Sequence, residues 1–163
     1  MLVHIYNYPV YFTMKFRFLF LFTCLTISLA KSQENPVYHI PITGTIDMGL
    51  PHYIQRVVNE AEKNKAVAVI FDIDTFGGRV DAATQIKDAI LDSDLLTVAF
   101  INRRAISAGA LISLSCEKIY MTGGASIGAA TAVDMSGKKG SEKVISFMRE
   151  EMASTAEKRN RNT

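Results

Sequence analysis

Residues 66–71 of the chain read Ala-Val-Ala-Val-Ile-Phe, and this run decides the fold class. It is continuous, apolar and rich in β-branched side chains, which is typical of a strand buried on both faces of a parallel sheet. Apolar residues at helical spacing precede it from residue 49 to about 64 and follow it from residue 80 to 90. A buried strand between two helices predicts βαβ units, so we expect an α/β protein.

The alternation of strands and helices continues towards both ends of the chain. The other expected elements are strands at residues 37–42, 96–101 and 118–121, and helices at about 106–115 and from about 141 onwards. Residues 122–128 are expected to form a loop that continues through small and polar residues to residue 140. These elements predict one domain at residues 37–163, with a largely parallel β-sheet, flanking helices and right-handed crossovers. Residues 31–36 are expected to be a linker.

Length and composition agree with a single folded domain. The chain has 163 residues, of which 48% are hydrophobic and 21% charged, and this balance fits a globular protein rather than a disordered one. The net charge of +2 is too small to indicate a nucleic-acid-binding surface. The basic cluster at residues 158–161 is interpreted as a solvated chain end. We expect no nucleic acid partner, no cofactor and no metal.

The first thirty residues have the layout of a secretory signal. Lys15 and Arg17 give a positive start, residues 18–29 are apolar, and residues 28–30, Ser-Leu-Ala, offer a cleavage site. A membrane-spanning helix needs about 20 apolar residues, so this stretch is short for an anchor, and an uncleaved anchor is the alternative. We expect export to a periplasmic or other extracytoplasmic location, with Met14 as the true start.

Ser107 lies where the expected strand at 96–101 gives way to the next helix, in the sequence Ala-Ile-Ser-Ala-Gly at residues 105–109. A helix start carries unpaired backbone N–H groups, which favour developing negative charge. The hydroxyl is therefore a candidate nucleophile for acyl transfer. The alternative is an ordinary capping or packing serine, because Ala105 stands where the Gly-x-Ser-x-Gly elbow has glycine.

Gly77 and Gly78 follow the central strand and are expected to turn the chain. Glycine lets backbone N–H groups approach a ligand closely, as an oxyanion hole requires. Ligand sites of open α/β sheets collect at the carboxyl ends of the strands, where we expect both this turn and Ser107. The alternatives are a turn without a functional role and, for nearby Asp74, a turn or cap residue rather than a catalytic acid.

The base that would activate Ser107 is chosen by elimination. The three histidines are His4, His39 and His52; all precede the serine, and none has a spacing suited to a triad. Lys143, on the expected last helix, is the best remaining candidate. A lysine can act as a base only if burial lowers its pKa towards neutrality.

Other interpretations of this lysine region stay open. Lys138 and Lys139, in the loop before the helix, are rival bases, and a lysine near a helix start is often a plain surface residue. Lys143 is preferred because an apolar stripe begins directly after it and would anchor its helix against the core. That stripe consists of Val144, Phe147, Met148 and Met152, and the polar residue Glu151 lies at its edge. Its apolar face is equally suited to assembly with a second chain.

Three segments together carry a resemblance to a known family. They are residues 74–82, Asp-Thr-Phe-Gly-Gly-Arg-Val-Asp-Ala, residues 106–110, Ile-Ser-Ala-Gly-Ala, and residues 126–129, Ser-Ile-Gly-Ala. In this order and spacing they resemble the protease domain of the NfeD family. That family belongs to the ClpP/crotonase superfamily and has signal peptide peptidase A as a cousin. The resemblance covers about residues 37 to 163 and implies a ClpP/crotonase-like fold.

The resemblance implies a serine endopeptidase with a Ser-Lys dyad. Ser107 matches the family's nucleophile and Lys143 its base, while Gly78 and Ala108, beside Gly77, match the residues whose amides hold the oxyanion. The implied substrate is an apolar segment of a membrane protein, with a stomatin-like protein as the usual partner. A homo-oligomer is expected because relatives oligomerise. Longer relatives continue into transmembrane helices and associate with the membrane, so this chain is expected to be C-terminally truncated.

Two other functions compete with the peptidase. A catalytically inactive scaffold would keep the fold and help to assemble membrane complexes, but the presence of both Ser107 and Lys143 argues against it. An acyl-CoA enzyme of the crotonase type would share the sheet and the oxyanion layout. The secretory signal argues against that enzyme, because coenzyme A chemistry is cytoplasmic.

Overall fold

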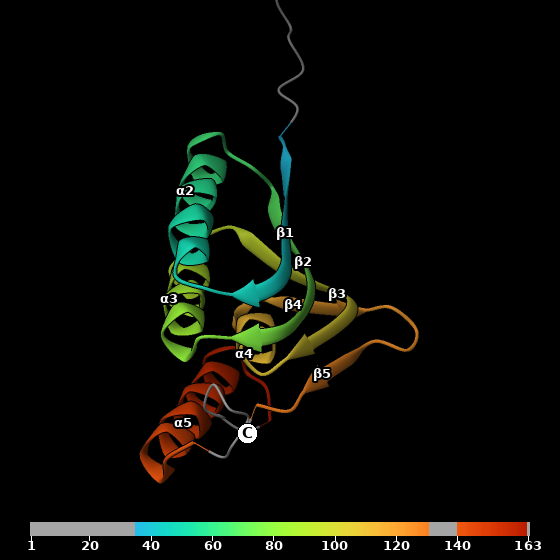
Figure 1. Cartoon of the computed structure of the whole chain (residues 1–163). Coiled ribbons are helices and arrows are strands. Elements are labelled where there is room, and N and C mark those ends of the chain that lie inside the picture. Colours follow the sequence, from blue (N-terminus) through green and yellow to red (C-terminus); the bar gives the residue numbers. More distant parts are fainter. Residues whose placement is uncertain (1–34, 131–139, 163) are drawn as a thin grey trace, which may run out of the picture. The chain divides into compact units, whose positions relative to one another are not determined.

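A computed structural model describes residues 35–130 and 140–162 (Figure 1). The chain alternates between strands and helices, as the sequence predicts. The elements are β1 (Val37–Ile46), α2 (Gly49–Lys63), β2 (Ala68–Gly78), α3 (Val80–Leu91), β3 (Leu96–Ile106), α4 (Ala108–Ser115), β4 (Lys118–Met121), β5 (Ser126–Gly128) and α5 (Glu142–Lys158). The expected leader and two of the three candidate lysines, Lys138 and Lys139, lie outside the described residues.

The sheet is parallel throughout the described part of the chain. Its strands lie in the order β1-β2-β3-β4, and β5 pairs with the end of β3 beyond β4. Each parallel pair from β1 to β4 is joined by a helix, as parallel strands require. The predicted α/β class with a largely parallel sheet is therefore confirmed.

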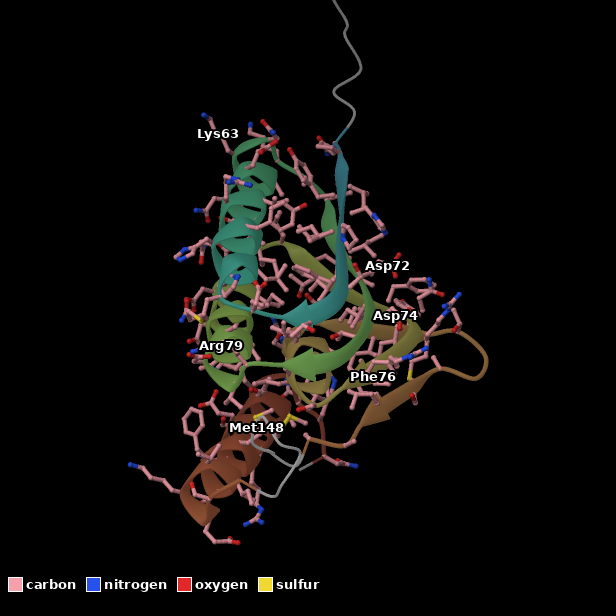
Figure 2. All side chains as sticks on the ribbon, in the orientation of Figure 1. Lys63, Asp72, Asp74, Phe76, Arg79 and Met148 are labelled. Atoms are coloured by element: carbon pink, nitrogen blue, oxygen red, sulfur yellow. The ribbon has the colours of Figure 1, made fainter. Side chains whose placement is uncertain are left out.

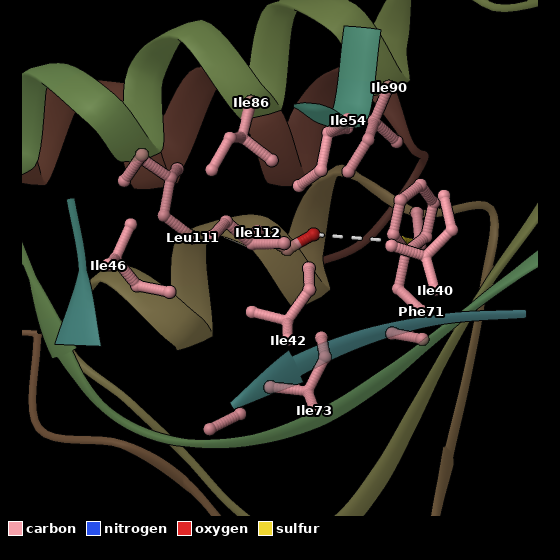
Figure 3. Packing of buried hydrophobic residues seen from close by; sticks show 14 of the residues in the cluster. Ile40, Ile42, Ile46, Ile54, Phe71, Ile73, Ile86, Ile90, Leu111 and Ile112 are labelled. Atoms are coloured by element: carbon pink, nitrogen blue, oxygen red, sulfur yellow. Dashed lines mark hydrogen bonds between the residues drawn. The ribbon is translucent and has the colours of Figure 1, made fainter. Parts of the chain in front are cut away.

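The helices α2, α3 and α4 lie against one face of this sheet (Figure 1). The side chains that point into that layer are fully buried, among them Ile42 on β1 and Ile73 on β2 (Figure 3). Ile101 on β3, which pairs with Ile73, is fully buried too. Each isoleucine buried in this way stabilises the fold by about 1.5–3 kcal/mol. The opposite face of β2 is only partly covered, because Ile70 and Asp72 are half-buried. The prediction that this strand is buried on both faces was therefore wrong.

The long strands β2 and β3 extend beyond their predicted ends. β2 continues to Gly78 and β3 to Ile106, with an irregularity in their pairing between Ile73 and Thr75. Gly77 and Gly78 are thus the last residues of a strand, paired with Thr45 and Ile46 of β1, rather than a turn after the strand. The expected loop at 122–128 also ends in a strand, because β5 pairs with residues 104–106 of β3.

The last helix, α5, begins where Ser141 accepts a hydrogen bond from the amide of Val144. Its buried residues are Ile145, Met148, Thr155 and Ala156. Of the predicted apolar stripe, Met148 is buried in the core and Met152 packs against it, whereas Val144 and Phe147 are 40% and 46% exposed. Within the described residues, no helix is both long enough and apolar enough to cross a membrane.

Candidate functional site

Ser107 occupies the turn between β3 and α4 with an unusual backbone. Its φ is 54° and its ψ is −114°. Residues other than glycine rarely adopt this combination, which costs about 1–3 kcal/mol. The serine amide donates to the carbonyl of Gly128 at 2.8 Å, and the serine carbonyl accepts from the amide of Ala110 at 2.9 Å. A strained serine between a strand and a helix is the geometry of a nucleophile elbow, although Ala105 replaces the first glycine of that motif.

Gly77 packs directly against this serine. Its φ is 107°, and a Cβ atom added to it would lie 2.8 Å from the Cβ of Ser107 and 3.2 Å from the amide nitrogen of Ala108. Only glycine fits there, because real Cβ atoms do not approach other atoms so closely. The end of β2 and the start of α4 are therefore in contact, as the sequence predicted for the two motifs.

The backbone amides near Ser107 differ in their partners. The Gly77 amide donates to the hydroxyl of Thr75 at 2.9 Å, so it is engaged within its own strand. The Arg79 amide donates to the carbonyl of Ile46 on β1 at 2.8 Å. The amide of Ala108 opens α4, where a helix has no carbonyl of its own to accept it. The helix start thus favours the Ala108 amide as a donor to an oxyanion, and the role of the Gly78 amide stays a prediction.

The outer side of the same strand end carries a polar and aromatic cluster (Figure 2). The guanidinium of Arg104 lies 3.2 Å from the carboxylate of Asp74 and 4.4 Å above the centre of the Phe76 ring. Asp74 therefore serves as an ion-pair partner in the described structure. Arg104 went unnoticed in the sequence, because nothing in its spacing shows that β3 extends far enough to bring it to Asp74.

Lys143, the predicted base of the dyad, is not bonded to Ser107 in the described structure. Lys143 is the second residue of α5 and is exposed. Among the described residues, no hydrogen bond or ion pair joins it to Ser107. The structure brings together Gly77, Gly78, Ser107 and Ala108 but leaves Lys143 in solvent. Of the histidines that are described, His39 pairs with Asp72 at 3.2 Å, and His52 is exposed on α2.

An apolar groove lies between the first turns of α3 and α5. Its volume is about 580 Å³, and its lining residues are Arg79, Val80, Asp81, Thr84, Gln85, Val144 and Phe147. One wall includes Arg79, which follows Gly78 in the sequence, and the other includes Val144, which follows Lys143. An ion pair of 2.6 Å between Arg79 and Asp81 lies at its rim. The hydrogen bond from Arg79 lowers the pKa of the Asp81 carboxyl.

Comparison with protein families identifies the domain. The family model described as NfeD1b, N-terminal domain, matches residues 36–163. The chain belongs to this NfeD1b family. The resemblance to the NfeD family that the three sequence motifs predicted is thereby confirmed. Residues 35–130 and 140–162 contain no group of three His, Cys, Asp or Glu side chains that could hold a metal ion.

Named relatives of this NfeD1b domain include a membrane protein and a protease. Membrane protein NfeD1b of Bacillus subtilis is 37% identical over 145 residues, which are 88% of this chain and 33% of the relative. Membrane-bound protease PH1510 of Pyrococcus horikoshii is 34% identical over 103 residues, which are 61% of this chain and 23% of that protease. The chain thus spans about a third or less of the length of these relatives.

Solved structures show the same fold. The 1510-N membrane-bound stomatin-specific protease, in a lysine-to-alanine variant with a bound substrate peptide, superposes with a TM-score of 0.70 at 30% identity. The match covers 79% of this NfeD1b domain and 61% of that chain. An asparagine-to-aspartate variant of ClpP1 from Listeria monocytogenes superposes with a TM-score of 0.62 at 21% identity, over 85% of this chain and 78% of that one. The domain therefore has a ClpP-like fold.

Proposed function

We propose that this NfeD1b domain is the catalytic domain of a serine endopeptidase with a Ser107–Lys143 dyad. The observation that carries the proposal is the backbone of Ser107, which is held at φ 54° between β3 and α4 and against Gly77. A backbone strain of this kind persists only where the surrounding structure fixes it, and such residues cluster at active sites. A serine that merely caps a helix needs no such strain.

The proposed reaction begins with attack of the Ser107 hydroxyl oxygen on a peptide carbonyl. Lys143, in its neutral form, accepts the hydroxyl proton as the new C–O bond forms. The amides of Gly78 and Ala108 donate to the negative oxygen of the tetrahedral intermediate. Lys143 returns its proton to the leaving amine as the C–N bond breaks, and water then hydrolyses the acyl-enzyme by the same route.

Because Lys143 is exposed, the substrate itself has to exclude water from this side chain. An ammonium in water keeps its proton at neutral pH, and its pKa falls only when the charged form loses solvent. An apolar segment in the groove would cover Val144 and Phe147, which lie next to Lys143 on α5. We therefore propose that apolar segments of membrane-associated proteins are the substrates and that their binding desolvates the base.

The named relatives support this assignment. The 1510-N protease is described as specific for a stomatin homologue. It has been solved as a serine-to-alanine variant and, with a substrate peptide, as a lysine-to-alanine variant. These are the two residue types of the proposed dyad. A stomatin-like protein is accordingly the partner that we propose, together with export of the domain, membrane association and self-assembly into a homo-oligomer.

The second candidate is an inactive ClpP-fold scaffold for membrane-complex assembly. The observation in its favour is the solvent-exposed Lys143, which no hydrogen bond or ion pair joins to Ser107 among the described residues. The two candidates differ in one respect: a scaffold has no reason to activate a serine hydroxyl.

The experiment that separates them is labelling with a fluorophosphonate probe, together with cleavage of an apolar peptide. We expect labelling of the wild type and its loss in Ser107→Ala and Lys143→Ala. Lys143→Arg keeps the charge but cannot give up the proton, so it should also be inactive, whereas Lys138→Ala and Lys139→Ala should be close to wild type. An unlabelled wild type would favour the scaffold.

A further inference from the structure

The end of α5 turns sharply back towards α4. Asn160 has a φ of 54°, and its amide donates to Glu157 at 2.9 Å, while the amide of Arg161 donates to Ala156 at 2.8 Å. This is a Schellman ending with asparagine in the left-handed position, which asparagine tolerates better than most residues. The turn directs two arginines, Arg159 and Arg161, at the neighbouring helix.

These two arginines, which we call the arginine clamp, hold the last carbonyls of α4. Arg159 Nε donates to the carbonyl of Ser115 at 2.7 Å. Arg161 Nη1 donates to Leu114 at 2.7 Å, and Arg161 Nη2 donates to Cys116 at 2.7 Å. The final carbonyls of a helix have no partner within the helix, and positive charge at that end is favourable. The basic cluster at residues 158–161 was predicted to be a solvated chain end, but two of its side chains, Arg159 and Arg161, bind the end of α4.

The other end of α4 is equally fixed. A Cβ atom on Gly109 would lie 2.6 Å from Cγ2 of Thr75, so the first turn is pressed against β2. Leu111 and Ile112 are fully buried in between. Eight helical residues span about 12 Å, which makes α4 a short rod with Ser107 at one end and the arginine clamp at the other.

We propose that Arg159 and Arg161 are positioning residues for Ser107. Strain at Ser107 is released if α4 moves along its axis away from β2, and the clamp opposes that movement from the far end of the helix. Without the clamp, we expect the Ser107 hydroxyl to move from its place at the start of α4. This proposal rests on the proposed peptidase function, because it concerns the rate at which Ser107 reacts.

The test compares Arg161→Ala and the double variant Arg159→Ala/Arg161→Ala with wild type. A displacement of about 1 Å at a reacting group can cost about 100-fold in rate, so we expect kcat to fall by about 10-fold or more while KM changes little. Labelling of Ser107 by the fluorophosphonate should fall by the same factor. Lys158→Ala is the matched control, because it removes a positive charge from the same helix end at an exposed residue, and it should be near wild type.

A second comparison separates positioning from loss of stability. Val58→Ala removes buried methyl groups from α2, away from α4, and lowers stability without touching the clamp. At a temperature where all variants are folded, it should retain wild-type kcat, and Arg161→Lys should recover only part of the rate because an ammonium cannot match the guanidinium fork. Equal kcat in wild type and the double variant would overturn the clamp proposal alone. A wild type that neither cleaves nor labels would overturn the peptidase function as well.

Discussion

The ammonium of Lys87 on α3 lies 2.7 Å from the carboxylate of Glu151 on α5, and the two side chains are only 11% and 18% exposed. Burial by itself lowers the pKa of Lys87, but its hydrogen bonds to Glu151 and Asp88 outweigh that effect, so the pKa is raised. The contact explains why a glutamate interrupts the apolar side of α5. It ties the helix that follows Gly78 to the helix that carries Lys143.

Removing one partner of this pair should cost more than removing both. Glu151→Ala leaves the largely buried ammonium with only the exposed Asp88, and we expect the free energy of unfolding to fall by about 1–3 kcal/mol. Lys87→Met/Glu151→Leu replaces the pair with apolar side chains and should be less destabilising than Glu151→Ala. Denaturant unfolding of wild type, Glu151→Ala and the double variant measures these free energies. A double variant that is less stable than Glu151→Ala would contradict the prediction.

Ser107→Gly should stabilise the domain while it abolishes catalysis. Glycine adopts φ 54° without strain, so part of the backbone cost of about 1–3 kcal/mol is relieved. Ser107→Ala also removes the hydroxyl but keeps the strain, and it should melt below Ser107→Gly. Thermal unfolding and fluorophosphonate labelling of both variants check this, and equal melting temperatures would mean that the turn stores no strain.

Gly77→Ala should disturb the site more than the fold. The new methyl group would meet Ser107 and Ala108, and both would have to shift. We expect cleavage to fall by about 100-fold, as for other small displacements of reacting groups. Gly123→Ala is the matched control because a Cβ there meets nothing within 4 Å. Activity that survives in Gly77→Ala would show that the contact between β2 and Ser107 is not needed for catalysis.

Cys116 should make the fold sensitive to alkaline pH. Complete burial, opposed by the nearby guanidiniums of Arg159 and Arg161, raises the pKa of its thiol from 9.0 to about 12. Between these values the unfolded thiol loses its proton while the folded one keeps it, so stability is full below pH 9 and falls by about 1.4 kcal/mol per pH unit above it. Unfolding of wild type and Cys116→Ala at pH 8 to 11 should show the smaller slope in the variant. Identical slopes would contradict the prediction.

Export predicts a defined amino terminus. If residues 1–30 are a cleaved signal, the mature protein should begin near Lys31, and mass spectrometry of the protein from the producing cell measures this directly. A protein that retains Met1 or Met14 and is recovered with the cytoplasm would contradict both cleavage and export. Recovery with the membrane and an intact first segment would instead identify an anchor.

The sequence predicted the first halves of the long strands better than the second halves. Residues 66–71 and 96–101 are apolar and β-branched, so local preference and burial agree. Residues 74–78 and 102–106 contain Asp, Gly, Asn and Arg, which have little strand preference, and they are extended because neighbouring strands pair with them. The three-residue strand β5 exists for the same reason, and no local pattern could reveal it.

The candidate site was predictable by residue type but not by conformation. Ser107 and the two glycines stand out because nucleophiles and close backbone approach need those residues. The positive φ of Ser107 follows from the contacts of β2, β5 and α4, which a single sequence does not show. The arginine clamp was missed because its partners are backbone carbonyls some 44 to 47 residues away, and carbonyls leave no signature in a sequence.

Because β2 is continuous, the same strand carries core residues in its first half and Gly77 in its second. Evolutionary change in what the domain recognises is therefore constrained along this strand, since a substitution that bends it disturbs the core and the turn at Ser107 together. The walls of the apolar groove are freer, because Val80 and Thr84 lie on α3 and Phe147 on α5, outside the sheet. Divergence in specificity among such domains should accumulate on these two helices, while the strands stay nearly unchanged.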